Sequence, residues 1–148
     1  MNLRIREANT ADLPQILNLY LHALEDKAVL TIEEAERVFD KMSSYPNYKV
    51  YVAENEVEMV GTFALLIMDN LGHIGTPSAV VEDIAVLPNY QGQGIGKQMM
   101  HFALAKATEA GCYKMALSSN LRRHDAHAFY ESLGFVKHGY SFKVDAEQ

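Results

Sequence analysis

The sequence predicts an α/β (α+β) fold in which helices pack against one mixed sheet. Residues 79–117 have the pattern strand, helix, strand, and two strands joined by a crossover helix are parallel. Residues 49–53 and 57–68 are two β-rich runs separated by a short polar segment, which predicts an antiparallel hairpin. No linker or repeat interrupts the 148 residues, so we expect a single domain over residues 1–148.

The first third of the chain predicts one strand and two helices. Residues 3–6 alternate apolar and charged side chains, as an edge strand does. Thr10 is the expected N-cap of a first helix, whose apolar residues recur at helical spacing as far as Leu24. Thr31 and Glu34 form a capping-box pattern, which predicts a second helix ending near residue 42.

The second half of the chain predicts the remaining elements. Residues 79–86 are a largely apolar strand that ends at Pro88, because proline cannot donate to a strand ladder. A glycine-rich turn at residues 91–96 then leads into a helix up to about residue 110. A strand at 113–117, a helix at about 124–133 and a closing strand at 136–144 complete a sheet of about six to seven strands with about four helices.

Composition and charge exclude several classes of protein. Apolar residues make up 49% and charged residues 22% of the chain, which argues against disorder. The net charge of −6 argues against a nucleic-acid partner and favours cationic substrates. The longest apolar run, Phe63–Met68, is too short to cross a membrane, and no signal peptide is evident. The single cysteine, Cys112, excludes an internal disulfide, which fits a reducing, cytoplasmic location.

The glycine-rich turn has the strand–turn–helix context that binds phosphate groups through backbone N–H groups. Lys97 and Gln98 follow the last glycine, whereas a P-loop needs lysine followed by serine or threonine. The spacing of Gly92, Gly94 and Gly96 also differs from the dinucleotide-binding pattern. Taken alone, the turn has an alternative interpretation as a tight connection between a strand and a helix.

Two sequence signatures at separate places in the chain make the interpretation of the turn more specific. Gln91-Gly92-Gln93-Gly94-Ile95-Gly96 matches Q/R-x-x-G-x-G/A, and residues 129–135 match F-Y-x-x-x-G-F. Both are signatures of the GNAT acetyltransferase superfamily, which this chain therefore resembles. Residues 81–86, 90–94 and 111–115 are similar to the glucosamine-6-phosphate N-acetyltransferase branch, whereas residues 118–125 are longer than that branch's segment.

The resemblance implies the GNAT fold, with a splayed pair of parallel strands at the site for acetyl-CoA. Because no nucleophile for a covalent intermediate is evident in the sequence, we expect direct transfer of acetyl to an amine in a ternary complex. Asn120 resembles the polar residue that hydrogen-bonds the CoA arm, with a cap or turn residue as the alternative. The implied cofactor-binding residues are Ile84, Ala85 and Val86 for the pantetheine arm, and Gln91, Gly92, Gln93, Gly94, Ile95, Gly96 and Lys97 for the diphosphate.

The resemblance also implies catalytic and acceptor-binding residues. Tyr130 matches the tyrosine that donates a proton to the departing sulfur, although a tyrosine on an amphipathic helix can also be a core residue. Glu82 is the favoured base because strand alternation places it on one face with Ile84 and Val86. Water or a backbone carbonyl is the rival route for proton removal. Glu82 and Asp83, with Arg122 and Arg123, are the expected acceptor-binding residues, and solvated surface charge is the alternative for the arginines.

The expected partner is a small-molecule amine, with a homodimer implied by the resemblance. His124 and His127 lack further ligands at suitable spacing, so we expect no metal. Cys112 is expected to be an apolar filler. Two rival functions remain: a catalytically silent acyl-CoA-binding module, and an acetyltransferase for protein N-termini or lysines. The acidic pair and Tyr130 argue against the first.

Overall fold

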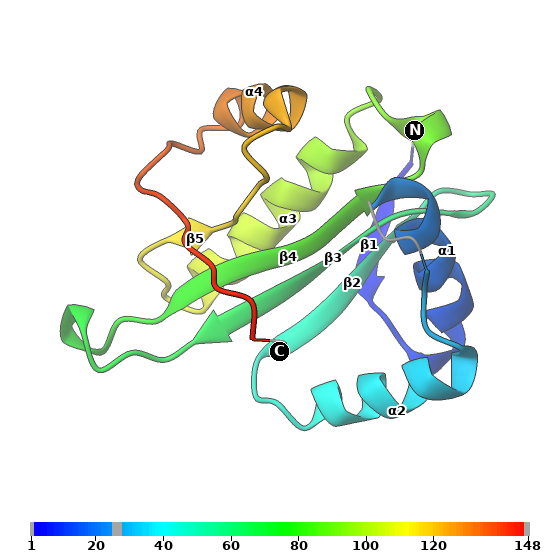
Figure 1. The fold of residues 1–148 in the computed structure, drawn as a ribbon, viewed down its shortest axis with the longest axis horizontal. Helices are drawn as coiled ribbons and strands as arrows, with labels where there is room; N and C mark the ends of the chain where they lie inside the picture. Colours follow the sequence, from blue (N-terminus) through cyan, green and yellow to red (C-terminus); the bar gives the residue numbers. More distant parts are fainter. Residues whose placement is uncertain (1, 25–27, 147–148) are drawn as a thin grey trace. The chain divides into compact units, whose positions relative to one another are not determined.

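The computed structural model describes residues 2–24 and 28–146, and the chain divides into two compact units, one ending at Ala116 and one beginning at Leu117. The first unit holds a five-stranded sheet whose strands follow one another in chain order (Figure 1). The first three pairs of neighbouring strands are antiparallel and the last pair is parallel, so the predicted mixed sheet is confirmed. The strands are β1 (Arg4–Glu7), β2 (Tyr48–Glu54), β3 (Met59–Met68), β4 (Ser78–Val86) and β5 (Met115–Ala116).

The described residues also contain four α-helices and three short 3-10 turns. None of the helices in this part of the chain is long and apolar enough to cross a membrane. The 3-10 turns are η1 (Thr10–Asp12), η2 (His73–Gly75) and η3 (Pro88–Tyr90). The helices are α1 (Leu13–Ala23), α2 (Ile32–Ser43) and α3 (Ile95–Glu109) in the first unit and α4 (His124–Ser132) in the second.

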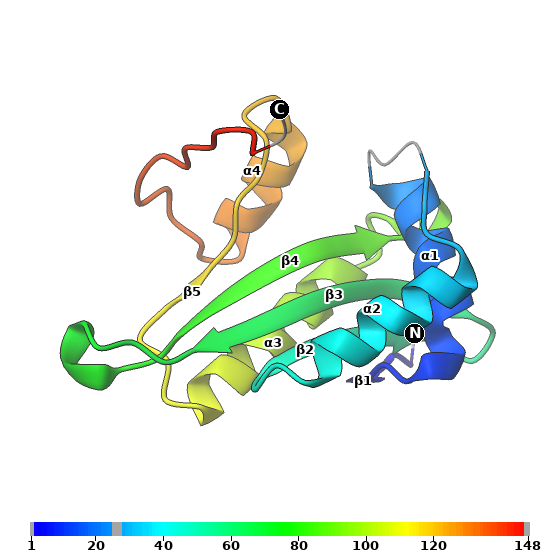
Figure 2. The ribbon, with the colours of Figure 1, turned by 60° about the horizontal axis from the view of Figure 1, so that its bottom comes forward.

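Helices cover both faces of the sheet in the first unit (Figure 2). On one face, α1 and α2 bury an apolar cluster with side chains of β2, β3 and β4, among them Val52, Ala64 and Ala85. On the other face, α3 packs against the ring of Phe63, which stacks on Tyr51 at 5.2 Å between centroids. Gly61 lets α3 come close, because a Cβ there would lie 2.9 Å from the sulfur of Met99. Burial of these apolar side chains is the main stabilising contribution to the unit.

The helix starts are partly as predicted. Thr31 caps α2, and its side chain and that of Glu34 form the expected capping box. The prediction that Thr10 is the first cap is wrong, because Asn9 accepts from the amide of Ala11 and forms a capping box with Asp12. Asn9 lies in extended backbone, as an N-cap residue requires.

The closing strand predicted at residues 136–144 is also wrong, and over residues 2–24 and 28–146 the sheet has five strands rather than six to seven. The side chains of Tyr140 and Phe142 are 87% and 89% exposed. Residues 117–146 contain no strand with which this segment could pair, and a strand needs partners for its backbone N–H and C=O groups. The strand predicted at 113–117 shortens to Met115–Ala116.

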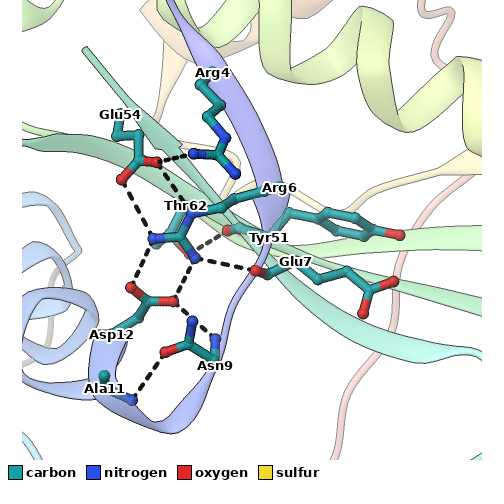
Figure 3. Close-up of polar contacts among 9 residues, drawn as sticks. All are labelled: Arg4, Arg6, Glu7, Asn9, Ala11, Asp12, Tyr51, Glu54 and Thr62. Carbon is teal, nitrogen blue, oxygen red and sulfur yellow. Dashed lines mark hydrogen bonds and ion pairs between the residues drawn. The ribbon is translucent and has the colours of Figure 1, made fainter. Parts of the chain in front are cut away.

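A network of charges around Arg6 fixes the entry to the first helix (Figure 3). Arg6 Nη1 and Nη2 donate to the two carboxylate oxygens of Asp12 at 2.7 and 2.9 Å. Arg6 Nε donates to Glu54 Oε1 at 3.0 Å, which links β1 to the end of β2. Asp12 is only 7% exposed and also accepts from the amide of Asn9 at 2.8 Å. Hydrogen bonding to Arg6 lowers the pKa of Asp12, which outweighs the opposing effect of burial.

Replacing Asp12 with Asn should destabilise the protein by about 1–3 kcal/mol at pH 7, because Arg6 keeps its charge and loses a bidentate partner. Since folding lowers the pKa of Asp12, its contribution is full above its ordinary pKa of 3.8 and is lost as the pH falls through the folded value. Urea unfolding of both proteins between pH 7 and pH 2.5 measures this. A difference in stability that stayed constant over that range would show that the ionised Asp12 carboxylate does not stabilise the protein through Arg6.

Candidate active site

The glycine-rich turn joins η3, which follows β4, to the start of α3, and its two left-handed glycines border open space. Gly92 and Gly94 have φ values of +77° and +85°, a left-handed conformation that side chains other than glycine rarely adopt. A Cβ at either glycine would meet nothing within 4 Å, so their backbone is open to a ligand. Gly94 is the N-cap of α3, so the start of this helix has no hydrogen bond from a capping side chain. The first turn of α3 also carries no acidic residue. These are the conditions under which a helix N-terminus binds an anion.

Two glutamines of the turn brace it against the preceding segment. Gln91 Nε2 donates to the carbonyl of Val86 at 3.2 Å, which ties the turn to the end of β4. Gln93 Nε2 donates to the carbonyl of Asn89 at 3.1 Å. Ile95 is 1% exposed and anchors the start of α3 in the core, whereas the turn itself is exposed. These two hydrogen bonds and the buried Ile95 therefore hold the turn in place, while residues 91–94 stay exposed to solvent.

Strand β4 has one fully paired edge and one largely open edge. β3 pairs with β4 from Ser78 to Val86, whereas β5 pairs with it only at Ala79 and Val80. Within the described residues of the first unit, no other strand lies beside the outer edge of residues 81–86. The backbone N–H and C=O groups along this edge can therefore form hydrogen bonds with solvent or with a ligand of extended shape. This open edge, immediately before the glycine turn, matches the splayed pair that was expected.

A β-bulge interrupts β4 at its acidic pair. Thr62 pairs with Ala85 and Ala64 pairs with Glu82, so that Asp83 and Ile84 together stand opposite the single residue Phe63. Asp83 has a φ of +53°. Backbone of this kind, in a residue other than glycine, costs of order 1–3 kcal/mol and is concentrated at functional sites.

The bulge changes which side chains share a face. Ala85 belongs to the apolar cluster with α1 and α2, and Glu82 pairs with Ala64 of the same cluster, so both lie on that side of the sheet. Val86 pairs with Gly61, which faces Met99 of α3. The expectation that alternation places Glu82 on the same face as Val86 is therefore wrong.

The carboxylates of the bulge are close enough to affect one another. Desolvation and the neighbouring charge of Asp83 both raise the pKa of Glu82. Both side chains are exposed at the surface of the unit. A carboxylate with a raised pKa is a better proton acceptor than an ordinary one, and an acidic pair also attracts an ammonium group.

The second unit carries the other predicted residues, and it is described by itself. Tyr130 in α4 is 9% exposed and contacts the rings of Phe129 and Phe135 at 5.3 and 5.7 Å between centroids. Burial raises the pKa of Tyr130, so its phenol stays protonated at neutral pH. Arg122 and Arg123 line an open hollow of about 440 Å³ at the start of α4.

Asn120 organises the turn before α4. Its Oδ1 accepts from the amide of Arg122 at 2.9 Å, and its carbonyl accepts from the amide of Arg123 at 3.0 Å. His127 Nε2 lies 2.7 Å from the same carbonyl. These contacts support a structural role as a turn residue, while its role in cofactor binding stays a prediction. In the described part of the chain, no group of three histidine, cysteine or acidic residues is arranged to hold a metal ion.

Comparison with known proteins agrees with this arrangement. The acetyltransferase (GNAT) family matches residues 13–135, and the chain therefore belongs to that family and is an N-acetyltransferase. It is 28% identical to the glucosamine 6-phosphate N-acetyltransferase of Trypanosoma brucei brucei, over 98% of this chain and 97% of that protein. It is 29% identical to the aminoalkylphosphonate N-acetyltransferase of Salmonella typhimurium, over 93% and 88% respectively.

Solved structures also resemble the fold. A putative acetyltransferase from Agrobacterium tumefaciens superposes with a TM-score of 0.90 and 34% identity, covering 96% of this chain and 99% of that one. Proteins of this family use acetyl-CoA as the acyl donor. The open glycine turn, the uncapped start of α3 and the open edge of β4 fit such a cofactor.

Replacing Gly94 with Val should abolish the stabilisation of the protein by acetyl-CoA. The side chain would occupy the space in front of the turn and would strain a backbone that has a φ of +85°. For the unchanged protein, acetyl-CoA at 100 times its Kd should raise the Tm by several degrees, roughly the effect of 2.7 kcal/mol of binding energy.

Gly72→Val is the matched control, because Gly72 also has open space around it but lies in the loop before β4 with a φ of −66°. It should keep the shift in Tm, and NAD should produce much less stabilisation than acetyl-CoA. A folded Gly94→Val protein that acetyl-CoA still stabilises fully would remove the turn from the cofactor site.

Proposed function

We propose that this chain transfers the acetyl group of acetyl-CoA to the primary amine of a small molecule, such as an amino sugar, by direct transfer in a ternary complex. The observation that carries the proposal is the bulge of β4. It combines an acidic pair, Glu82 and Asp83, with an open backbone edge that runs into the glycine turn. The activities named for the two relatives above support a small, amine-bearing acceptor.

The cofactor would be held mainly by backbone groups. Amides of residues 92–97 suit the diphosphate, because they end in a helix N-terminus without a side-chain cap. The edge at Ile84, Ala85 and Val86 suits the extended arm. When bound, acetyl-CoA supplies an acetyl group already activated as a thioester.

Glu82 is the group best placed to receive a proton from the acceptor. An amine is mostly protonated at neutral pH and must lose a proton before it can attack a carbonyl carbon. The raised pKa of the Glu82 carboxyl brings it nearer to that of an amine, and Asp83 adds a second negative charge that holds the ammonium form. Glu82 therefore binds and deprotonates the acceptor in this proposal, either directly or through one water molecule.

Tyr130 is the proposed proton donor to the leaving group. Burial keeps its Oη proton in place at neutral pH. Cys112, the single cysteine, has a pKa raised by burial, which keeps it as a thiol and makes it a poor nucleophile. A covalent intermediate on Cys112 is thus disfavoured, which supports direct transfer.

Release of free thiol from acetyl-CoA in the presence of a panel of amines tests the proposal directly. Glucosamine 6-phosphate should increase thiol release well above the rate without an amine, and mass spectrometry should find the acetylated product. Tyr130→Phe is the matched control, since it keeps the ring and should lower kcat by about 10²-fold while the KM for acetyl-CoA stays near its original value. A protein that binds acetyl-CoA but acetylates no small amine or peptide would contradict the proposal.

The acidic pair predicts the pH dependence of the reaction. Because Asp83 raises the pKa of Glu82, kcat/KM should rise with pH through an apparent pKa above that of an ordinary glutamate. Asp83→Asn removes the like charge and should shift this rise to lower pH. Glu82→Gln should remove the rise and lower kcat by about 10²-fold, within the range of a general base. A profile that Glu82→Gln leaves unchanged would instead favour proton removal through water or a backbone carbonyl.

A further inference from the structure

The open edge of β4 ends at Val86, and the ladder with β3 shows which way the backbone of this residue points. The amide of Leu87 donates to the carbonyl of Val60 at 2.9 Å, so Leu87 faces β3. Gly61 and Val86 are the next pair in this ladder. In an antiparallel ladder, hydrogen-bonded pairs alternate with pairs whose backbone groups point away from each other. The N–H and C=O groups of Val86 therefore point away from β3, toward the open edge.

The side chain of Gln91 reaches back to the carbonyl at this end of the edge. Gln91 Nε2 donates to the carbonyl oxygen of Val86 at 3.2 Å. Two backbone hydrogen bonds hold the chain between them, from the amide of Tyr90 to the carbonyl of Leu87 at 2.9 Å and from the amide of Gln91 to that of Pro88 at 3.3 Å. An extended ligand at the open edge would thus meet the amide of Val86 beside a carbonyl that already accepts one hydrogen bond.

This side-chain hydrogen bond connects the two halves of the candidate cofactor site. Its acceptor is the last residue of β4, and its donor is the first residue of the glycine turn that leads into α3. Gln91 is exposed, so its side chain does not serve to fill the core. A fixed distance between two subsites matters to a ligand that contacts both, because the second contact then forms at a high effective concentration. A turn that moved relative to the edge would have to be ordered on binding, at a cost in affinity.

We propose that Gln91 is a positioning residue, whose side-chain amide holds the glycine turn at a fixed distance from the open edge of β4 through Val86. It acts on ligands that contact both the edge and the turn, as acetyl-CoA does in the proposed function. This inference rests on that placement of the cofactor, but it depends neither on the acceptor nor on acetyl transfer. The rival role is direct contact of the Gln91 amide with the diphosphate.

Binding of CoA and of its two parts distinguishes these roles independently of turnover. The probes are CoA, which spans both subsites, ADP, which carries the diphosphate, and pantetheine, which is the extended arm. NMR titration gives a Kd for each probe, including weak ones. Gln91→Met keeps the length of the side chain and removes its donor. It should weaken CoA binding about fivefold, the net effect of one hydrogen bond, and leave ADP and pantetheine within about twofold.

Asn70→Leu is the matched control, because Asn70 Nδ2 also donates to a backbone carbonyl, that of Thr76, at 2.8 Å in the loop before β4. It should leave the Kd of all three probes unchanged. A kinetic readout accompanies the binding data: Gln91→Met should raise the KM for acetyl-CoA about fivefold with kcat nearly unchanged, because uniform binding is lost. Gln91→Ala should show the same pattern, and melting curves show that each variant is folded.

The possible results separate the inference from its rival and from the proposed function. Equal weakening of ADP and CoA by Gln91→Met would overturn the inference in favour of direct contact with the diphosphate. It would also be overturned by unchanged CoA affinity in the folded variant, by weakening of pantetheine alone, or by failure of the unchanged protein to bind any one of the three probes. A protein that shows the expected pattern of binding but acetylates no amine would refute the proposed function alone.

Discussion

The extra residue in β4 is the constraint on which the arrangement of the candidate site depends. With Asp83 and Ile84 together opposite Phe63, the ladder on the β3 side resumes at Ala85 one residue out of step. Glu82 and Ala85 then point toward α1 and α2, and Asp83 adopts a left-handed backbone. Without the bulge, Ala85 would lie on the opposite face from Glu82 and would leave the apolar cluster that it helps to form.

The bulge also belongs to a strand with two very different edges. On one side, β3 holds β4 over its whole length, and on the other, β5 holds only Ala79 and Val80. Buried backbone groups without partners are costly, so an open edge in the middle of a sheet is stable when solvent or a ligand supplies the partners. The glycine turn follows β4 and leads into α3. The backbone groups of the open edge and those of the turn therefore lie close together along the chain.

Much of the fold follows from local chemistry in the sequence. The capping box of Thr31 and Glu34, the β-hairpin and the strand–turn–helix around Gly94 all depend on residues close together in the chain, and all were predicted correctly. The bulge at Asp83 was not predicted, because a change of register depends on the partner strand as much as on the residue itself. Residues 136–144 were predicted to form a strand, but the sequence of a segment carries no information about its partner in the ladder.

In the proposed cofactor site, backbone groups of β4 and of the glycine turn together hold CoA. Titration of ¹⁵N-labelled protein with CoA, with each amide followed by NMR, shows which of these groups contact the cofactor. The amides of residues 84–86 and 92–97 should show the largest shift changes at saturation. Residues 71–75, in the loop before β4, serve as the internal reference and should stay unchanged. If saturating CoA leaves residues 84–86 and 92–97 unshifted, the cofactor does not bind at β4 and the glycine turn.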